Sequence, residues 1–178
     1  MIHLARHGQT AYNAEGRFQG HLPVPLDDTG REQARALAET VAQVEVRGFM
    51  CSPLARARET AEIVAERIGI EPEEDARFAE TDTGDWTDRS FAEVKATDPE
   101  GFRRFEISDP TFRYPGGESF AEQSDRVQAG LADLRARPGA LPALVVCHRG
   151  VIRLALAVAT GDHTAGGREI GNATLVTL

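Results

Sequence analysis

The sequence predicts a three-layer α/β/α sandwich, in which a mostly parallel central sheet lies between two layers of helices. Short apolar segments typical of buried strands alternate with amphipathic segments of helical periodicity along the 178 residues. This alternation favours strand–helix–strand crossovers and therefore parallel strands. Chains of this length usually close around one core, so we expect residues 1–178 to form a single domain.

The first part of the chain is expected to hold three strands and two helices. An apolar segment over 2–6 predicts a buried strand, and the polar residues 8–29 predict a long loop after it. Loops of that length in compact domains are usually functional. The next elements are a helix opened by a Thr29–Glu32 capping box, a strand over 44–51, a helix opened by Ser52 and Pro53 and ended by Gly69, and a weak strand within 70–80.

The second part is irregular before residue 119 and regular after it. Residues 84–118 are expected to leave the sheet as an excursion with two short helices, over 91–97 and 101–107, the first opened by Ser90 and Glu93. The later elements are a helix opened by Ser119 and Glu122 and ending near residue 137, a buried strand over 143–147, an apolar helix to Thr160 and one edge strand over 173–178.

The composition argues against several classes of partner. The net charge of −8 disfavours nucleic acid, because phosphate backbones select basic surfaces. The longest apolar run, over 141–147, is too short to cross a membrane, and the first residues lack a signal-peptide pattern. Two cysteines, Cys51 and Cys147, suit neither a disulfide framework nor a metal site. We therefore expect a cytoplasmic protein with no membrane partner, as a monomer or homodimer.

Arginine carries nearly all the positive charge, since Lys95 is the only lysine. Genomic base composition is one explanation. The other is that some of the guanidinium groups bind phosphate through two parallel hydrogen bonds.

Three polar segments directly follow expected strands: Arg6-His7-Gly8, residues 52–56 and His148-Arg149-Gly150. In α/β sheets, ligands bind at the carboxyl ends of the strands. Taken singly, a histidine at a strand end or an arginine in a first helical turn is usually a packed or solvated residue. Three such segments at one edge of one sheet predict a functional site.

These segments carry motifs that resemble the histidine phosphatase superfamily, also called the phosphoglycerate mutase-like family. The Arg-His-Gly triplet alone is a weak signal, but the order and spacing of six blocks hold from residue 4 to about 153. The blocks are Leu4 to Thr10 with Tyr12 and Asn13, Gln19-Gly20 with Pro25-Leu26 and Gly30, Ser52-Pro53-Leu54-Ala55-Arg56-Ala57 with Thr60-Ala61, Glu80 with Gly84 and Trp86, Pro115-Gly116-Gly117-Glu118-Ser119, and Val145 to Arg153.

The resemblance implies that His7 is a nucleophile that accepts a phosphoryl group and becomes a phosphohistidine. A neutral imidazole can attack phosphorus at pH 7, and guanidinium groups keep it neutral while stabilising the phosphoryl oxygens. No metal or other cofactor is expected, because the sequence has no obvious cluster of metal ligands. The phosphate clamp would consist of Arg6, Arg56 and His148, with Asn13, Gln19, Gly20 and Arg149 as further substrate contacts.

The leaving alkoxide needs a proton, which a carboxylic acid supplies only where its surroundings keep it protonated. The family pattern places Glu80 in this role, beside Trp86. Three nearby acids are rivals by sequence distance: Asp82, Asp85 and Asp88.

The chain departs from the family pattern at two places. Thr87-Asp88 stands where Glu-Gly is common, which loosens the alignment near Glu80 but leaves that residue in register. Arg149 stands where a small residue is common, and its side chain is expected either to reach the pocket as an anion contact or to point into solvent. Arg17 and His21 likewise either line the pocket mouth or are solvated loop residues.

The same site could transfer phosphate to water, as a phosphatase, or to a second hydroxyl, as a mutase. The sequence stops after its last expected strand, and the 84–118 segment is short for the mutase branch, so water is the expected acceptor of a small phosphorylated substrate. A binding module without catalysis is disfavoured because every core residue is present.

The 84–118 segment is expected to be a substrate-selecting cap, or else a plain hydrophobic cluster, with Phe102, Phe105, Phe112 and Tyr114 among Arg103, Arg104 and Arg113.

Overall fold

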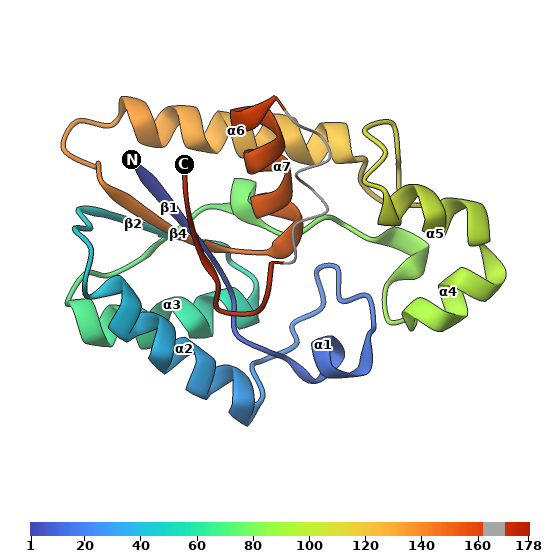
Figure 1. Cartoon of the computed structure of the whole chain (residues 1–178), viewed down its shortest axis with the longest axis horizontal. Coiled ribbons are helices and arrows are strands. Elements are labelled where there is room, and N and C mark those ends of the chain that lie inside the picture. The colour runs from blue at the N-terminus through green and yellow to red at the C-terminus, as the bar shows by residue number, and fades with distance from the viewer. Residues whose placement is uncertain (162–169) are drawn as a thin grey trace.

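A five-stranded sheet forms the centre of the computed structural model, which describes residues 1–161 and 170–178 (Figure 1). The strand order is β3-β2-β4-β1-β5, and β5 alone is antiparallel to its neighbour. This arrangement confirms the predicted fold class and the single antiparallel edge strand. The strands are β1 (Ile2–Arg6), β2 (Gly48–Cys51), β3 (Glu73–Glu74), β4 (Ala143–Cys147) and β5 (Leu175–Thr177).

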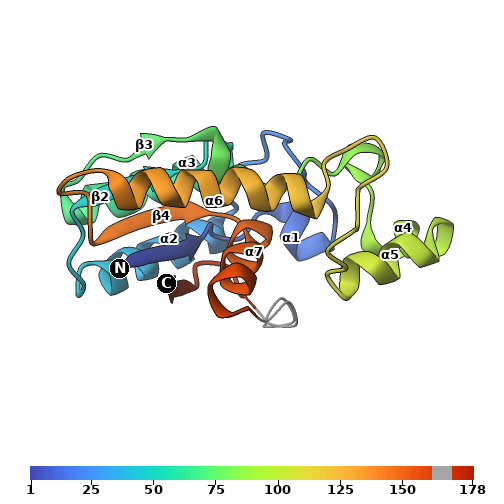
Figure 2. The ribbon, with the colours of Figure 1, turned by 90° about the horizontal axis from the view of Figure 1, so that it is seen from above.

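Two pairs of helices cover the two faces of the sheet (Figures 1 and 2). Side chains alternate between the faces of a strand. Accordingly Leu144 and Val146 of β4 pack against α2 (Asp28–Val41) and α3 (Ala55–Ile68). Val145 and Cys147 pack against α6 (Phe120–Ala136) and α7 (Arg149–Thr160).

The excursion from the sheet contains η2 (Gly84–Trp86), α4 (Phe91–Thr97) and α5 (Pro99–Glu106). Both views place α4 and α5 at the end of the molecule opposite the chain termini. A separate aromatic core holds this segment together, with Trp86 only 1% exposed at its centre. The core consists of Phe18, Trp86, Val94, Phe102, Phe112, Tyr114 and Phe120, with Phe105 and Leu154 packed against it.

Two expected helix starts are wrong, and competing hydrogen bonds explain both. Asp27 rather than Thr29 caps α2, because its carboxylate accepts from the backbone N–H of Gly30 at 2.7 Å. The third helix begins at Ala55, without a side-chain cap at Leu54. Ser52 does not cap it, since its hydroxyl bonds a histidine ring on the neighbouring strand end at 2.7 Å.

The loop expected over 8–29 contains a short helix, α1 (Ala11–Glu15), opened by a Thr10–Asn13 capping box. The second strand begins at Gly48, because Arg47 donates its backbone N–H to Pro142 and Val44 is exposed to solvent. The capping boxes expected at Ser90–Glu93 and Ser119–Glu122 are confirmed.

Candidate active site

Strand register brings the two sequence-predicted histidines together. Arg6 pairs with Cys147 across β1 and β4, so the next residues, His7 and His148, leave the sheet side by side. The backbone N–H of His7 donates to Cys147 O at 3.0 Å, and the two imidazole centroids are 5.1 Å apart. Ser52 follows the adjacent strand β2 and donates its N–H to Val146 O at 2.9 Å.

A cavity opens at this edge of the sheet, between the strand ends and the aromatic excursion. Its wall combines the predicted clamp, the loop after β1 and the excursion. Its polar lining is Arg6, His7, Asn13, Arg17, Gln19, Gly20, Arg56, Glu80, Thr81, Thr83, Arg149, Gly150 and Arg153, and its aromatic lining is Phe18, Phe91, Phe105, Tyr114 and Phe120.

The local backbone fixes the protonation state of His7. Its Nδ1 lies 2.6 Å from the carbonyl oxygen of Gly8, which can only accept, so Nδ1 carries the proton. Burial lowers the pKa of His7 well below its usual range, and the positive charges of Arg56 and Arg6 lower it further. The ring is therefore neutral, and the lone pair on Nε2 has no partner among the described residues.

His148 lies behind this nucleophile position and does not line the cavity. The side chain is completely buried, and Nε2 shares a 2.7 Å hydrogen bond with the hydroxyl of Ser52. Burial, then the charge of Arg56, lowers the pKa of His148 well below its usual range. Its Nδ1 is buried without a protein partner, which leaves one ring nitrogen for a ligand.

The two clamp arginines are held by backbone carbonyls rather than by acids. Arg6 donates to Ile170 O at 2.6 Å, and Arg56 donates to Gly20 O at 2.9 Å and Leu22 O at 3.3 Å. Burial lowers the pKa of each to about 10, so both remain charged at neutral pH. Their Nε groups are buried without a protein partner.

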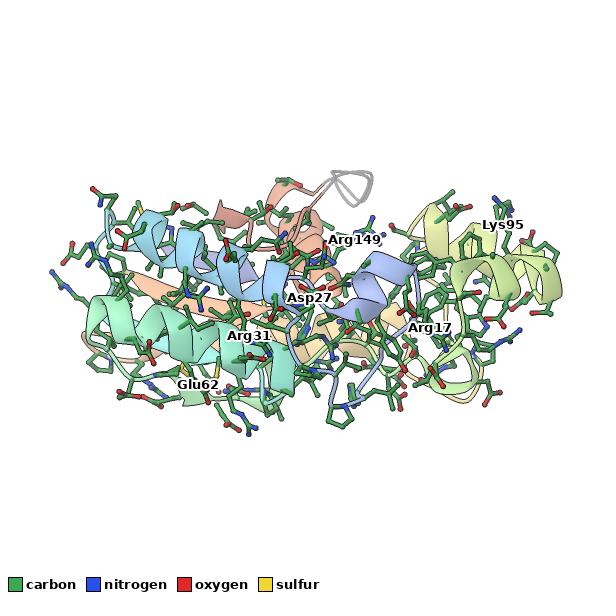
Figure 3. All side chains as sticks on the ribbon, turned by 90° about the horizontal axis from the view of Figure 1, so that it is seen from below. Arg17, Asp27, Arg31, Glu62, Lys95 and Arg149 are labelled. Carbon is green, nitrogen blue, oxygen red and sulfur yellow. The ribbon has the colours of Figure 1, made fainter. Side chains whose placement is uncertain are left out.

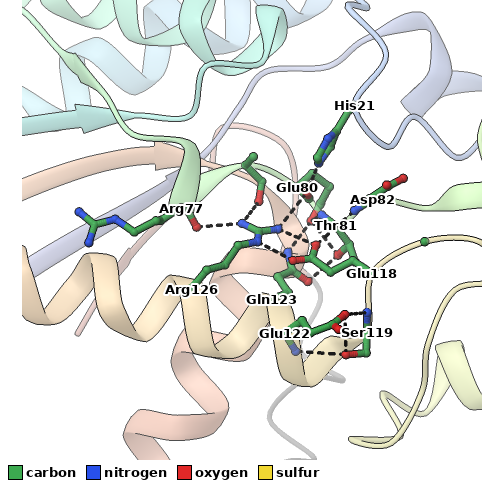
Figure 4. Close-up of polar contacts among 12 residues, drawn as sticks. His21, Arg77, Glu80, Thr81, Asp82, Glu118, Ser119, Glu122, Gln123 and Arg126 are labelled. Carbon is green, nitrogen blue, oxygen red and sulfur yellow. Dashed lines mark hydrogen bonds and ion pairs between the residues drawn. The ribbon is translucent and has the colours of Figure 1, made fainter.

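Glu80 reaches the same cavity from the segment after β3 (Figure 4). One carboxylate oxygen accepts from the N–H of Thr81 at 3.0 Å and from the amide of Gln123 at 3.2 Å. The other accepts from the backbone N–H of Gly150 at 3.2 Å. A Cβ at position 150 would lie 2.3 Å from this carboxylate, so a larger residue there would displace the Glu80 side chain.

A neighbouring arginine fixes the backbone of the Glu80 segment. Arg126 on α6 donates to the carbonyl oxygens of Arg77, Ala79 and Glu80 at 2.7–3.1 Å, and it forms a two-point ion pair with Glu118 (Figure 4). Nothing in the sequence singled out Arg126 for this role.

The three rival acids lie elsewhere. Asp82 accepts a hydrogen bond from the backbone N–H of Gly84, and Asp85 lies in the first turn of η2. Asp88 accepts hydrogen bonds from Tyr12 and Arg17, both at 2.6 Å. None of them lines the cavity. Trp86 belongs to the aromatic core and does not line the cavity either. The apolar wall comes instead from Phe18, Phe91, Phe105, Tyr114 and Phe120.

The remaining predicted contacts, Asn13, Gln19, Gly20 and Arg149, all line the cavity. Gln19 accepts a hydrogen bond from Thr10 at 2.8 Å. Of the two loop residues with open alternatives, Arg17 lines the cavity and pairs with Asp88. The imidazole of His21 instead bonds the backbone carbonyl of Glu80 at 2.7 Å, outside the cavity.

The excursion contributes aromatic side chains to the cavity but not its arginines. Among the described residues, Arg103 pairs with Glu100, Arg104 with Asp109, and Arg113 with Glu122. The arginines of the excursion are therefore paired with acids, and none of the three lines the cavity.

Sequence reasoning missed Arg153 and Asn172. Arg153 lies one helical turn after Arg149, and this i, i+4 spacing could have indicated it. Asn172 donates to the carbonyl oxygen of His7 and to the side chain of Asn13, a contact with no local signal in the sequence. Within residues 1–161 and 170–178, no group of three or more His, Cys, Asp or Glu side chains is placed to hold a metal, and no helix could span a membrane.

A neutral histidine among arginines at the carboxyl edge of the sheet can accept a phosphoryl group whose charge the guanidinium groups stabilise. The chain belongs to the histidine phosphatase superfamily (branch 1), which it matches over residues 2–178. The resemblance noted in its motifs is thereby confirmed.

The chain is similar to both phosphatases and mutases of known name. It is 36% identical over 149 residues to a probable phosphoglycerate mutase, GpmB, of Salmonella choleraesuis, covering 83% of this chain and 69% of the relative. A mycobacterial glucosyl-3-phosphoglycerate phosphatase solved with VO3 superposes with a TM-score of 0.90 at 33% identity, covering 98% of this chain and 90% of the other. A putative alpha-ribazole-5'-P phosphatase of Escherichia coli superposes with a TM-score of 0.78 at 31% identity, covering 88% of this chain and 77% of the other.

Proposed function

We propose that this protein is a metal-independent phosphomonoesterase that hydrolyses a small phosphorylated metabolite through a phosphohistidine at His7. The observation that carries the proposal is the 2.6 Å hydrogen bond from His7 Nδ1 to Gly8 O. It fixes the tautomer, so the lone pair of a neutral ring is on Nε2, and it supports the positive charge that the ring acquires when Nε2 bonds phosphorus.

The reaction runs in two steps at one phosphorus atom. Nε2 of His7 forms the N–P bond, the P–O bond to the leaving group breaks, and protonated Glu80 gives its proton to the departing oxygen. Water then attacks the phosphohistidine, Glu80 takes a proton from it, and the N–P bond breaks to release phosphate.

The clamp stabilises charge on the three equatorial oxygens during both steps. Arg6 and Arg56 have buried Nε groups without protein partners, and these are available to the phosphoryl oxygens. With the Ser52 hydroxyl as the donor to Nε2 of His148, the proton of that ring is on Nδ1, which has no partner among the described residues and lies beside His7 rather than in the cavity wall.

Hydrolysis is favoured over transfer to a second hydroxyl by the structural neighbours. Two of them are named as phosphatases, and one covers nearly the whole chain. The sequence relative named as a probable mutase keeps mutase activity as the second candidate.

An aryl phosphate assay tests the proposal. Wild-type protein in EDTA should release phosphate from p-nitrophenyl phosphate, and His7→Ala should abolish the release. Acid quench during turnover should trap an acid-labile phosphate on the peptide that contains His7. Absence of turnover in a folded, phosphate-binding protein would establish a binding module instead.

Mutase activity is distinguished from hydrolysis by the product of the reaction. With 3-phosphoglycerate and 2,3-bisphosphoglycerate, a mutase forms 2-phosphoglycerate without net phosphate release, whereas the proposed enzyme releases inorganic phosphate.

A further inference from the structure

Two arginines of the cavity wall have no partner among the residues that the structure describes. Arg149 and Arg153 lie one turn apart on α7, and neither forms an ion pair or hydrogen bond with any residue in 1–161 or 170–178. Most other arginines of this acidic protein pair with carboxylates or carbonyls. Arg149 is exposed, and it lies on the same face of the molecule as Arg17 (Figure 3). Arg153 is only 8% exposed, and its Nε is buried without a partner.

The positive charge in this cavity exceeds what one phosphate group needs. Arg6 and Arg56 flank the nucleophile and match the two negative charges of a phosphate monoester, while Arg17 is already paired with Asp88. Arg149 and Arg153 add two charges against the single acid of the wall, Glu80. Burial lowers the pKa of Arg153, and the charge of Arg149 lowers it further, against smaller opposing effects of Tyr114 and Glu80.

Arg153 also marks where the active-site cavity meets a second hollow. The second hollow shares Phe120, Gly150 and Arg153 with the first. It continues past them between α7 and the excursion, lined also by Ser108, Pro110, Gln123, Leu154 and Ala157. His7 lines the first hollow but not the second, so a group bound on the Arg153 side belongs to the body of the substrate rather than to the reacting phosphate.

We propose that Arg149 and Arg153 bind a second anionic group of the substrate, a carboxylate or a second phosphate. The substrate class is then small phosphate monoesters that carry a further acid group, such as phosphorylated hydroxy acids or bisphosphates. The inference rests on the proposed function for the position of the first phosphate. Guanidinium groups suit both carboxylates and phosphates, since both accept two parallel hydrogen bonds.

Non-hydrolysable phosphonates test this site without relying on turnover. Calorimetry would compare propylphosphonate, 3-phosphonopropanoate and propane-1,3-diphosphonate. Wild-type protein should bind at least one of the two diacids about tenfold or more tightly than propylphosphonate, in line with a charge-assisted hydrogen bond. The stronger of the two diacids identifies the second group as carboxylate or phosphate.

The Arg149→Gln and Arg153→Gln variants should each lower this preference, and the double variant should reduce it to about threefold or less. Arg17→Gln is the matched control: it removes one charge from the same cavity but leaves the unpaired arginines, so the preference should remain. Equal binding of all three ligands by the wild type, or a preference retained in the double variant, would overturn the proposal.

The aryl phosphate assay separates this outcome from failure of the proposed function. Diacid preference without aryl phosphate turnover would leave the second-anion site standing and refute the hydrolase. Aryl phosphate turnover without diacid preference would support the hydrolase and refute the second-anion site.

Discussion

At the scale of single residues, the site works by deciding which nitrogen of each histidine is protonated. The carbonyl oxygen of Gly8 accepts a hydrogen bond from Nδ1 of His7, and the hydroxyl of Ser52 forms a hydrogen bond with Nε2 of His148. Neither contact involves an acid, so neither favours a permanently charged imidazole in a cage of arginines. The two rings thereby differ in position: His7 lines the cavity, and His148 is buried beside it.

Replacing Ser52 by alanine should lower kcat about tenfold and change KM little, because it leaves His148 with both ring nitrogens unpartnered in a buried position. The measurement is steady-state hydrolysis of p-nitrophenyl phosphate. Ser90→Ala serves as control, since Ser90 also bonds through its hydroxyl but caps α4 far from the histidines. A rise in KM at constant kcat would assign Ser52 to binding rather than to positioning His148.

Glu80→Gln should slow alkyl phosphates at least tenfold more than p-nitrophenyl phosphate, because only the poor leaving group requires the proton. Gly150→Ala should reproduce this pattern, since its Cβ would displace the same carboxylate. The comparison is kcat for a series of esters with rising leaving-group pKa. If both variants slow all esters equally, Glu80 is not the proton donor.

Sequence alone placed most of this site, because its residues directly follow strands whose carboxyl ends meet at one edge of the sheet. It did not place Arg153, whose role depends on the packing of α7 against the excursion. The prediction that Ser52 caps a helix was wrong, because local capping signals cannot show that its hydroxyl bonds His148, 96 residues away. Trp86 was similarly associated with Glu80 by sequence proximity alone, whereas aromatic packing takes it into a separate core.

At the scale of elements, capping residues explain which boundaries were predictable. Ser90 and Ser119 each bond within three residues of themselves, so their helices begin where the sequence indicates. The start of α2 shifted because Asp27, two residues earlier than Thr29, is the better-placed acceptor. The short β3 strand has no apolar pattern, since both of its residues are exposed, and only its pairing with β2 defines it.

Arg126→Gln should destabilise the segment that carries Glu80. The substitution leaves three carbonyl acceptors and the largely buried Glu118 without their charged donor, so we expect a loss of about 2–3 kcal/mol in the free energy of unfolding. Urea titration measures this loss. Arg137→Gln is the control, because its ion pair with Glu73 is exposed and should contribute about 1 kcal/mol or less.

The same Arg126 variant should lose kcat for alkyl phosphates more than for p-nitrophenyl phosphate, since its effect reaches chemistry through Glu80. Loss of stability with an unchanged ratio of the two activities would limit Arg126 to a structural role.

At the scale of the whole molecule, the buried histidines tie stability to pH. The pKa of His7 and the pKa of His148 are both well below the value of about 6.5 that an unfolded histidine has. Below that pH the unfolded chain takes up protons that the native protein does not, so stability falls as the pH is lowered. Salt-bridged carboxylates act in a separate window, because Asp109 and Glu122 have pKa values of about 2 and lose their contribution only in stronger acid.

The free energy of unfolding should therefore decrease by about 3 kcal/mol between pH 6.5 and pH 5 from these two histidines, at about 1.4 kcal/mol per pH unit for each once the unfolded histidines are fully protonated. Urea titrations at pH 7.5, 6.5 and 5.0 measure the slope. His7→Gln removes one of the two titrating groups while keeping a side chain that can donate to Gly8 O, so its slope should be about half that of the wild type. A wild-type stability that stays constant over this range would mean that the histidines are protonated in the folded state. In that case His7 would lack the lone pair on which the proposed chemistry depends.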